Sequence, residues 1–139
     1  MLVVDASVLA KIYVEEPGSA KAELVLSEID LLVPGHAFGE AGEVLARKIR
    51  SGLAEPAMIE RMIAAMTANF RQIPLEGLLG PAVELSIASG ASVYDCLYVV
   101  AAMQNSCRLV TADGRLIDKM ASGPHHQLLI PLDSYTGPG

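Results

Sequence analysis

Four acidic residues stand at positions where an α/β chain commonly carries out chemistry: Asp5, Glu40, Asp95 and Asp113. Asp5 and Asp113 each follow a short apolar run typical of a buried strand, and each precedes a segment with a helical pattern. The carboxyl ends of parallel strands lie at one edge of a sheet, which is where open α/β folds bind ligands. We therefore expect Asp5 and Asp113 at equivalent points of that edge.

The other two acids are placed by predicted helices. Glu40 lies on the largely apolar face of the helix predicted over 37–50, and buried acids are rare unless they are paired or bind a metal. Asp95 lies in the first turn of a helix predicted from Ser92, inside an apolar run. The helix dipole keeps a carboxylate ionised there, as metal binding requires.

Purely structural roles are also open for three of these acids. Asp5 and Asp113 could cap the helices that follow them, because aspartate is a favoured N-cap residue. Asp113 also forms an Asp-Gly pair typical of turns. Ser92 with Asp95 three residues later resembles a capping box.

Convergence of the four carboxylates would have a chemical consequence. Each pair about 5 Å apart would repel by roughly 3 kcal/mol at an effective dielectric constant of ~20, and a divalent cation would cancel that charge. All four groups offer oxygen, and the pattern contains no Cys or His, which favours Mg²⁺ or Mn²⁺ over zinc. Such a site supports hydrolysis of a phosphodiester by a metal-activated water.

The elements that must position these acids alternate along the chain. Apolar runs predict strands over 2–4, 30–33, 71–75, 107–111 and 127–130, and helical spacing predicts helices over 6–14, 19–28, 37–50, 55–69, 78–89, 92–103 and 114–121. Pro81 fits its helix only in the first turn. This alternation predicts a single α/β domain over 1–133, with a central, mostly parallel sheet flanked by helices. Residues 134–139 are expected to form a flexible tail.

Composition narrows the possible partners and the compartment. The 139 residues suffice for one domain, and a hydrophobic content of 52% suggests that apolar surface faces a partner or a second copy. A net charge of -6 argues against a wide nucleic-acid footprint but permits a local one. Without a basic leader or an apolar run of ~20 residues, we expect a cytoplasmic protein with no membrane contact. Cys96 and Cys107 show no metal spacing and are expected to be reduced.

Four motifs together resemble the PIN-domain family, and within it the VapC-type ribonuclease toxins of bacterial toxin–antitoxin pairs. They are Val3-Val4-Asp5-Ala6-Ser7, Pro34 with Glu40 six residues on, Tyr94-Asp95 followed by Tyr98 and Ala101-Ala102, and Leu109-Val110-Thr111-Ala112-Asp113. They run from one end of the chain nearly to the other, in the order and spacing of the family.

The resemblance implies a ribonuclease that depends on Mg²⁺ or Mn²⁺, cuts RNA internally and acts as a toxin. It implies a metal pocket made by the four acids, with Ser7 and Thr111 as supporting polar groups. It also implies a homodimer and a cognate antitoxin that lays a peptide across an apolar groove and blocks the pocket, often with a basic side chain. Two residues depart from the pattern: Glu43, where these toxins often carry Asn, and Gly42, a poor helix former in mid-helix. Glu43 is also placed to pair with Arg47 on the helix surface.

Two other functions compete with this interpretation. A phosphatase of the haloacid-dehalogenase type also has an acid after its first strand, the aspartyl nucleophile, and Asp113 with Asp118 could form its late acid pair. Ser7 stands where that enzyme has its second acid, and Glu40 and Asp95 would have no role. A non-catalytic PIN-like binding module is the other alternative, and the presence of all four acids argues against it.

Overall fold

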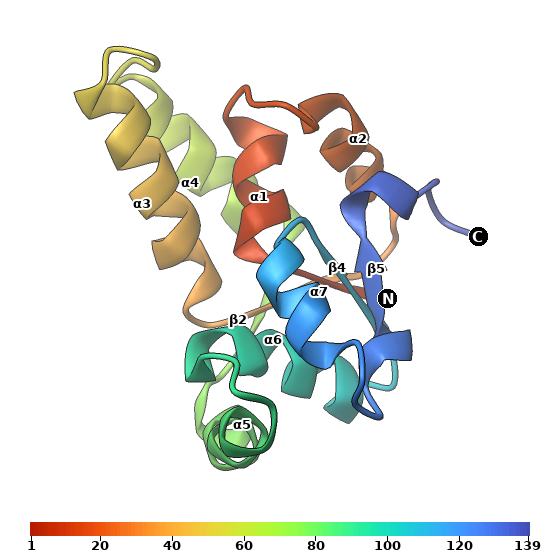
Figure 1. The fold of residues 1–139 in the computed structure, drawn as a ribbon. Coiled ribbons are helices and arrows are strands. Elements are labelled where there is room, and N and C mark those ends of the chain that lie inside the picture. The colour runs from red at the N-terminus through yellow and green to blue at the C-terminus, as the bar shows by residue number, and fades with distance from the viewer.

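A five-stranded parallel sheet forms the centre of the computed structural model, which describes residues 1–139 (Figure 1). The strands lie in the order β3-β2-β1-β4-β5. Their bounds are β1 Leu2–Val4, β2 Leu31–Pro34, β3 Arg71–Ile73, β4 Arg108–Thr111 and β5 Leu129–Pro131. All four pairings are parallel, with Val4 opposite Val110 and Val3 opposite Leu32. The predicted α/β domain with a parallel sheet is confirmed.

Helices cover both faces of this sheet. Their bounds are α1 Ala6–Tyr13, α2 Ser19–Glu23, α3 Ala37–Arg50, α4 Met58–Asn69, α5 Glu76–Ser89, α6 Val93–Gln104 and α7 Gly114–Met120, with short 3-10 turns at Leu24–Ser27, His126–Leu128 and Leu132–Ser134. Figure 1 shows α1 to α4 on one side of the sheet and α5 and α6 on the other. The segment predicted as one helix over 19–28 instead changes to a 3-10 turn after Glu23.

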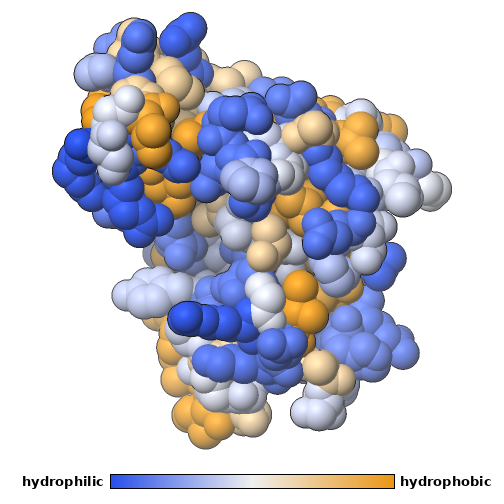
Figure 2. Space-filling model, turned by 45° about the horizontal axis from the view of Figure 1, so that its top comes forward, coloured by the Kyte–Doolittle hydropathy of each residue, from blue (hydrophilic) through white to orange (hydrophobic).

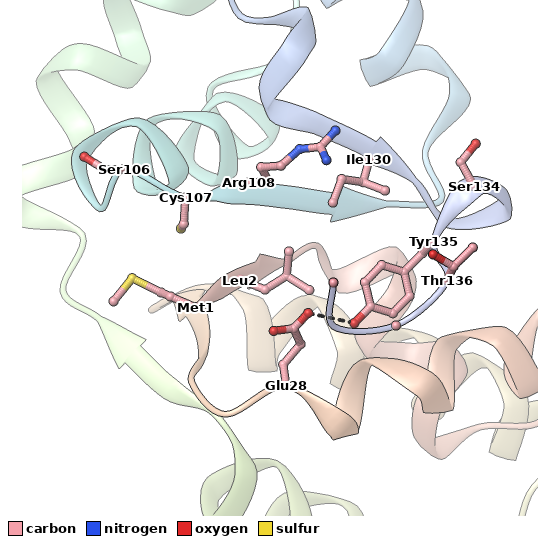
Figure 3. A pocket seen from close by; sticks show the side chains of 12 residues that line it. Met1, Leu2, Glu28, Ser106, Cys107, Arg108, Ile130, Ser134, Tyr135 and Thr136 are labelled. Atoms are coloured by element: carbon pink, nitrogen blue, oxygen red, sulfur yellow. Dashed lines mark hydrogen bonds between the residues drawn. The ribbon is translucent and has the colours of Figure 1, made fainter.

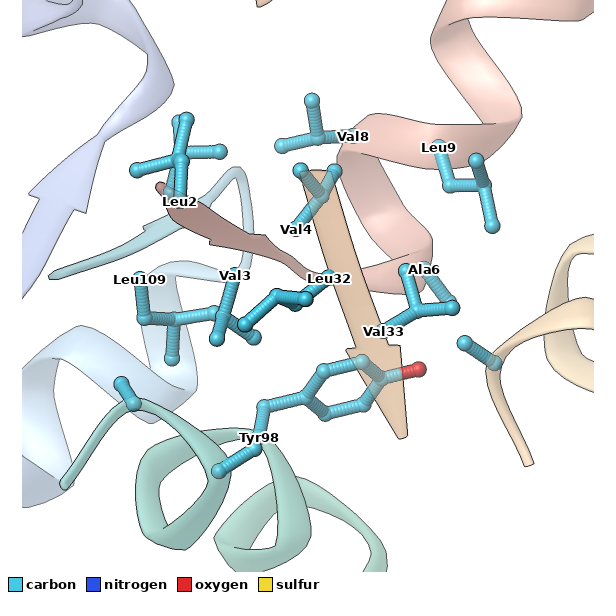
Figure 4. Packing of buried hydrophobic residues seen from close by; sticks show 14 of the residues in the cluster. Leu2, Val3, Val4, Ala6, Val8, Leu9, Leu32, Val33, Tyr98 and Leu109 are labelled. Atoms are coloured by element: carbon cyan, nitrogen blue, oxygen red, sulfur yellow. The ribbon is translucent and has the colours of Figure 1, made fainter. Parts of the chain in front are cut away.

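The core explains why β1 lies at the middle of the sheet. Val3 and Val4 are fully buried, because helices cover the central strands on both faces. Tyr98 of α6 packs from one side of the sheet and Val8 of α1 from the other (Figure 4). The central position of β1 places Asp5 in the middle of the carboxyl edge of the sheet.

Pro81 lies deeper inside α5 than the first turn, so that expectation is wrong. A proline at this position has no N–H to donate to the carbonyl of Gly77, four residues before it. Gln104 at the end of α6 supplies the missing donor, because its Nε2 lies 2.9 Å from the Gly77 carbonyl oxygen. A bond from the neighbouring helix therefore replaces one within α5.

The end of the chain packs against the domain beyond the predicted limit at residue 133. Tyr135 is buried, and its hydroxyl donates to Glu28 Oε1 at 2.9 Å. Tyr135, Arg108 and Leu2 line a cavity of about 600 Å³ at the amino edge of the sheet, opposite Asp5 (Figure 3). Flexibility of the remaining residues, 136–139, stays a prediction.

No helix on its own has the length and apolar character needed to cross a lipid bilayer. The helices α5 and α6 reach that length only when they are taken together, across a bend of 116°.

Candidate functional site

The four predicted acids line a single open pocket of about 290 Å³. Asp5 comes from the β1–α1 junction, Glu40 from α3, Asp95 from the start of α6, and Asp113 from the β4–α7 junction. Four separate elements thus bring their carboxylates to the carboxyl edge of the sheet. The structure therefore brings the four side chains to one pocket, with wider spacing than direct contact.

Asp5 is held by two hydroxyl groups. It is only 5% exposed, and its Oδ2 accepts hydrogen bonds from Thr111 Oγ1 at 2.5 Å and from Ser7 Oγ at 2.8 Å. Its Oδ1 accepts none. Although Asp5 occupies the N-cap position of α1, its side chain makes no capping bond, so the capping alternative fails for this residue.

The same two hydroxyls bind the loop that carries Asp113. The N–H of Asp113 donates to Thr111 Oγ1 at 3.0 Å, and the N–H of Ala112 donates to Ser7 Oγ at 3.0 Å. Each hydroxyl therefore accepts from the β4–α7 loop while it donates to Asp5. These contacts fix the loop relative to Asp5; a supporting role for Ser7 and Thr111 beside a metal stays a prediction.

Burial, and to a smaller extent neighbouring negative charge, raises the pKa values of two of the acids. Burial raises the pKa of Asp5 to about 6, against the opposing effect of the Thr111 and Ser7 hydrogen bonds, and the charges of Asp95 and Glu40 raise it further. Burial also raises the pKa of Asp95, followed by the charge of Asp113. These carboxylates are thus close enough to destabilise each other's ionised form.

Glu40 is held by two residues that the sequence analysis did not place in the site. Its Oε1 accepts a hydrogen bond from the Tyr98 hydroxyl at 2.6 Å and lies 3.2 Å from His36 Nε2. Burial raises the pKa of Glu40, but the bonds from His36 and Tyr98 and the charge of His36 outweigh it and lower the pKa overall. The available signals were weak: His36 precedes Glu40 by one helical turn, and Tyr98 follows Asp95 by one.

The other two acids, Asp113 and Asp95, lie at capped helix ends and also line the pocket. Asp113 Oδ1 accepts from the N–H of Arg115 at 3.0 Å and of Leu116 at 3.4 Å, which makes Asp113 the N-cap of α7. At Asp95 the cap is Ser92, whose hydroxyl accepts the Asp95 N–H at 3.1 Å. The capping alternatives are therefore correct for these helix ends, yet they leave carboxylate oxygen available to the pocket.

Glu43 lies at the rim of the pocket. Its side chain is 60% exposed, and its Oε1 lies 3.5 Å from Arg50 Nη2. The predicted partner, Arg47, is wrong; Arg47 also lines the pocket and forms no ion pair. Glu43 is thus a solvated fifth acid beside the other four.

The donor set fits a hard divalent cation, although its side chains are spread around the pocket. No three His, Cys, Asp or Glu groups lie close enough together in the structure to hold a metal ion. Repulsion between like charges favours this wider spacing, and a cation would reverse that balance. Each of Asp5 and Glu40 offers one carboxylate oxygen without a hydrogen bond. Oxygen-only donors of this kind suit Mg²⁺ or Mn²⁺.

Comparison with known proteins identifies the family. The family model described as PIN domain matches residues 2–122. Ribonuclease VapC3 of Pyrobaculum aerophilum is 31% identical over 122 residues, which cover 85% of this chain and 93% of the relative.

Two solved structures share the fold. The crystal structure of PAE2754 from Pyrobaculum aerophilum aligns with a TM-score of 0.71 at 21% identity, over 95% of this chain and 89% of that one. A toxin–antitoxin complex from Klebsiella pneumoniae aligns with a TM-score of 0.67 at 13% identity, over 95% and 98%. With the family model and the VapC3 relative both matching most of its length, the chain belongs to the PIN domain family.

Proposed function

We propose that this protein is a ribonuclease that cuts RNA internally with the help of Mg²⁺ or Mn²⁺ and acts in the cytoplasm as the toxin of a toxin–antitoxin pair. The observation that carries the proposal is the single pocket that Asp5, Glu40, Asp95 and Asp113 line from four separate elements. A fold gains no stability from gathering like charges, so the arrangement favours a role in binding a cation. The similarity to Ribonuclease VapC3 supports the choice of reaction.

In this proposal the four acids hold the cation, and Ser7 and Thr111 fix Asp5 in the orientation that exposes Oδ1. When bound, the cation supplies an activated water and stabilises the charge that develops on the phosphate. Burial and the charge of Asp113 raise the pKa of Asp95, against the opposing effect of a hydrogen bond from Ser92. A bound cation would therefore stabilise the ionised form of Asp95.

RNA contact is proposed to be local, because the chain as a whole is acidic. Arg47 is the basic residue that lines the acid pocket, and its guanidinium forms no ion pair in the structure. A guanidinium free of carboxylate partners can bind a backbone phosphate beside the pocket. The phosphate to be cut would then lie between Arg47 and the cation.

A second cavity supports an antitoxin partner. An apolar groove of about 480 Å³ runs between α3 and α4; its lining residues are Phe38, Gly39, Gly42, Leu45, Ala46, Ile49, Ile59, Met62, Ile63 and Met66. Gly42, unexpected in mid-helix, lines this groove, and a Cβ placed there would meet no atom within 4 Å. The helix α3 lines both the groove and the acid pocket, with different residues, so a peptide that blocks the pocket would extend from the groove around α3. The structural neighbour from Klebsiella pneumoniae is itself a toxin–antitoxin complex.

A homodimer is part of the same proposal. Leu79, Val83 and Ile87 follow one another at intervals of four along α5, and all three are exposed. Figure 2 shows hydrophobic side chains at the lower end of the molecule, where α5 lies. Burial of this stripe against a second copy would remove it from water.

Membership of the PIN domain family sets aside the phosphatase with an aspartyl nucleophile. One experiment distinguishes the nuclease from the remaining alternative, the non-catalytic binding module. RNA is incubated with the protein in Mg²⁺, Mn²⁺ or EDTA, and the ends are mapped. We expect cleavage that EDTA stops and that Asp95→Asn abolishes, while Asp118→Asn, which removes an exposed carboxylate outside the pocket, cleaves normally. Unchanged cleavage by equally stable Asp5→Asn and Asp95→Asn variants would favour the non-catalytic module and a contaminating nuclease.

A further inference from the structure

We propose that Tyr98, assisted by His36, positions Glu40 for cation binding and thereby sets the affinity of the pocket without contacting the cation. This inference rests on the proposed function, because it concerns the same four acids. Tyr98 is fully buried, and its hydroxyl lies 2.6 Å from Glu40 Oε1, a contact between residues 58 positions apart. The bond joins α6, on one side of the sheet, to α3, on the other.

Both donors meet the same oxygen of Glu40. His36 Nε2 lies 3.2 Å from Oε1, the atom that Tyr98 also contacts, and Oε2 accepts no hydrogen bond. Asp5 shows the same arrangement, since Thr111 and Ser7 both donate to Oδ2. In each acid, the contacts gather at one oxygen and leave the other free for the pocket; at Glu40 the hydrogen bond comes from Tyr98, and His36 adds an ion-pair contact. That repetition at two unrelated positions is the main argument for a positioning role.

The surroundings of His36 support this. Its Nε2 is also 3.1 Å from the Tyr94 carbonyl oxygen, and its ring lies 4.8 Å from the Tyr98 ring between centroids. Its Nδ1 is buried without a partner. The polar contacts that hold this ring are therefore all made through the nitrogen that faces Glu40.

Tyr98 also links two of the proposed cation-binding acids. It follows Asp95 by three residues on α6, so one helix carries an acid of the pocket and the hydroxyl that orients a second acid. A shift of α6 would change the position of Asp95 and the hydrogen bond to Glu40 at the same time. Residues that orient metal-binding carboxylates typically contribute a factor of about 10 to 100 in metal affinity.

A conservative substitution separates this role from packing. Tyr98→Phe keeps the buried ring and removes only the hydroxyl, and Tyr94→Phe is the matched control, because Tyr94 lies on the same helix, is 64% exposed and makes no hydrogen bond through its hydroxyl. Titration calorimetry with Mn²⁺ on the full chain measures the affinity. We expect Tyr98→Phe to weaken Mn²⁺ binding about tenfold or more and Tyr94→Phe to leave it unchanged.

A double-mutant cycle tests whether Tyr98 acts through Glu40. In a Glu40→Ala background, Tyr98→Phe should have no further effect on Mn²⁺ affinity, because the oriented group is gone. Equal weakening in both backgrounds would overturn the proposal, as would unchanged affinity in Tyr98→Phe alone. If Tyr98→Phe does not fold, His36→Phe removes the other donor and keeps a ring, and it should also weaken binding.

Asp95→Asn distinguishes failure of this inference from failure of the proposed function. If the unaltered protein binds no Mn²⁺, or if Asp95→Asn binds it equally well, the metal pocket itself is wrong. If Asp95→Asn abolishes binding while Tyr98→Phe binds like the unaltered protein, only the positioning role is wrong.

Discussion

Thr111 Oγ1 donates to Asp5 Oδ2 at 2.5 Å, although the two residues lie 106 positions apart in the chain. The contact joins the carboxyl ends of the adjacent strands β4 and β1. Thr111 is fully buried, and its hydroxyl also accepts the N–H of Asp113. The Thr111 hydroxyl therefore connects the side chain of Asp5 to the backbone of Asp113.

Replacement of Thr111 by valine should therefore destabilise the protein. The shape of the side chain is kept, but Asp5 loses a donor and the Asp113 N–H loses its acceptor, at about 1–3 kcal/mol for an unsatisfied buried group. Urea unfolding measures the change in the free energy of unfolding. Thr67→Val is the control, because the Thr67 hydroxyl is exposed and bonds only to Ile63 in its own helix. A loss no larger than that of the control would show that the Thr111 hydroxyl is unimportant.

The raised pKa of Asp5 predicts a loss of stability as the pH rises. The folded protein holds the Asp5 proton up to a pKa of about 6, whereas the ordinary value is 3.8, so the folded state binds more protons between these values. Stability from this group is present below pH 3.8 and is lost as pH rises through about 6, by roughly 3 kcal/mol in all. Unfolding by urea between pH 4 and pH 7, without divalent cations, measures this.

Asp5→Asn isolates that contribution, since Glu40 acts in the opposite direction through its lowered pKa. As the pH rises, the unaltered protein should lose stability relative to Asp5→Asn. Mg²⁺ should reduce the loss, because a bound cation favours the ionised carboxylate. A difference that stays constant between pH 4 and pH 7 would contradict the raised pKa.

The bond between Gln104 and Gly77 predicts a dependence on Pro81. In the unaltered protein, Gln104→Met should destabilise by about 1 kcal/mol, because the Gly77 carbonyl loses its donor. Pro81→Ala restores an N–H for that carbonyl, so Gln104→Met should have a much smaller effect in that background. Thermal unfolding of the four proteins measures the coupling; additive effects would mean that the two donors are not interchangeable.

If the antitoxin binds in the apolar groove, a substitution in the groove should prevent neutralisation by the antitoxin and leave the toxicity of the protein intact. Ile63→Lys places a charge in the groove at a side chain that is already 53% exposed, so the fold and RNA cleavage should be kept. Growth of cells that express the variant with the cognate antitoxin should nevertheless stop, because the antitoxin binds poorly. Ile29→Lys, fully exposed and outside the groove, is the control. Full rescue of Ile63→Lys by the antitoxin would place the peptide elsewhere.

The strands and helices that carry the site residues could be predicted from the sequence, because the pattern that indicates each one lies within a single element. The apolar run before Asp5 and the helical spacing over 37–50 each lie within one element, and α3 begins and ends as predicted. The order of strands and acids then places Asp5 and Asp113 at the same edge. Glu40 was identified because an acid on an apolar helix face is unusual.

The supporting contacts could not be predicted because they join elements distant in sequence. His36 is a lone histidine before a helix, and its contact with Tyr98 exists only because the fold brings the first turns of α6 close to the residue that precedes α3. Spacing suggested Arg47 as the partner of Glu43, whereas the side chain reaches Arg50, two turns along α3. The tolerance of α5 for Pro81 likewise depends on Gln104 of another helix.

The central claim, that the four acids hold a divalent cation, is tested most directly by anomalous X-ray diffraction from crystals soaked in Mn²⁺. We expect anomalous density in the acid pocket, within bonding distance of the free Oδ1 of Asp5 and of the Asp95 carboxylate, and no such density in crystals of Asp95→Asn. Crystals of the unaltered protein with an empty pocket, or with manganese bound only elsewhere, would contradict it.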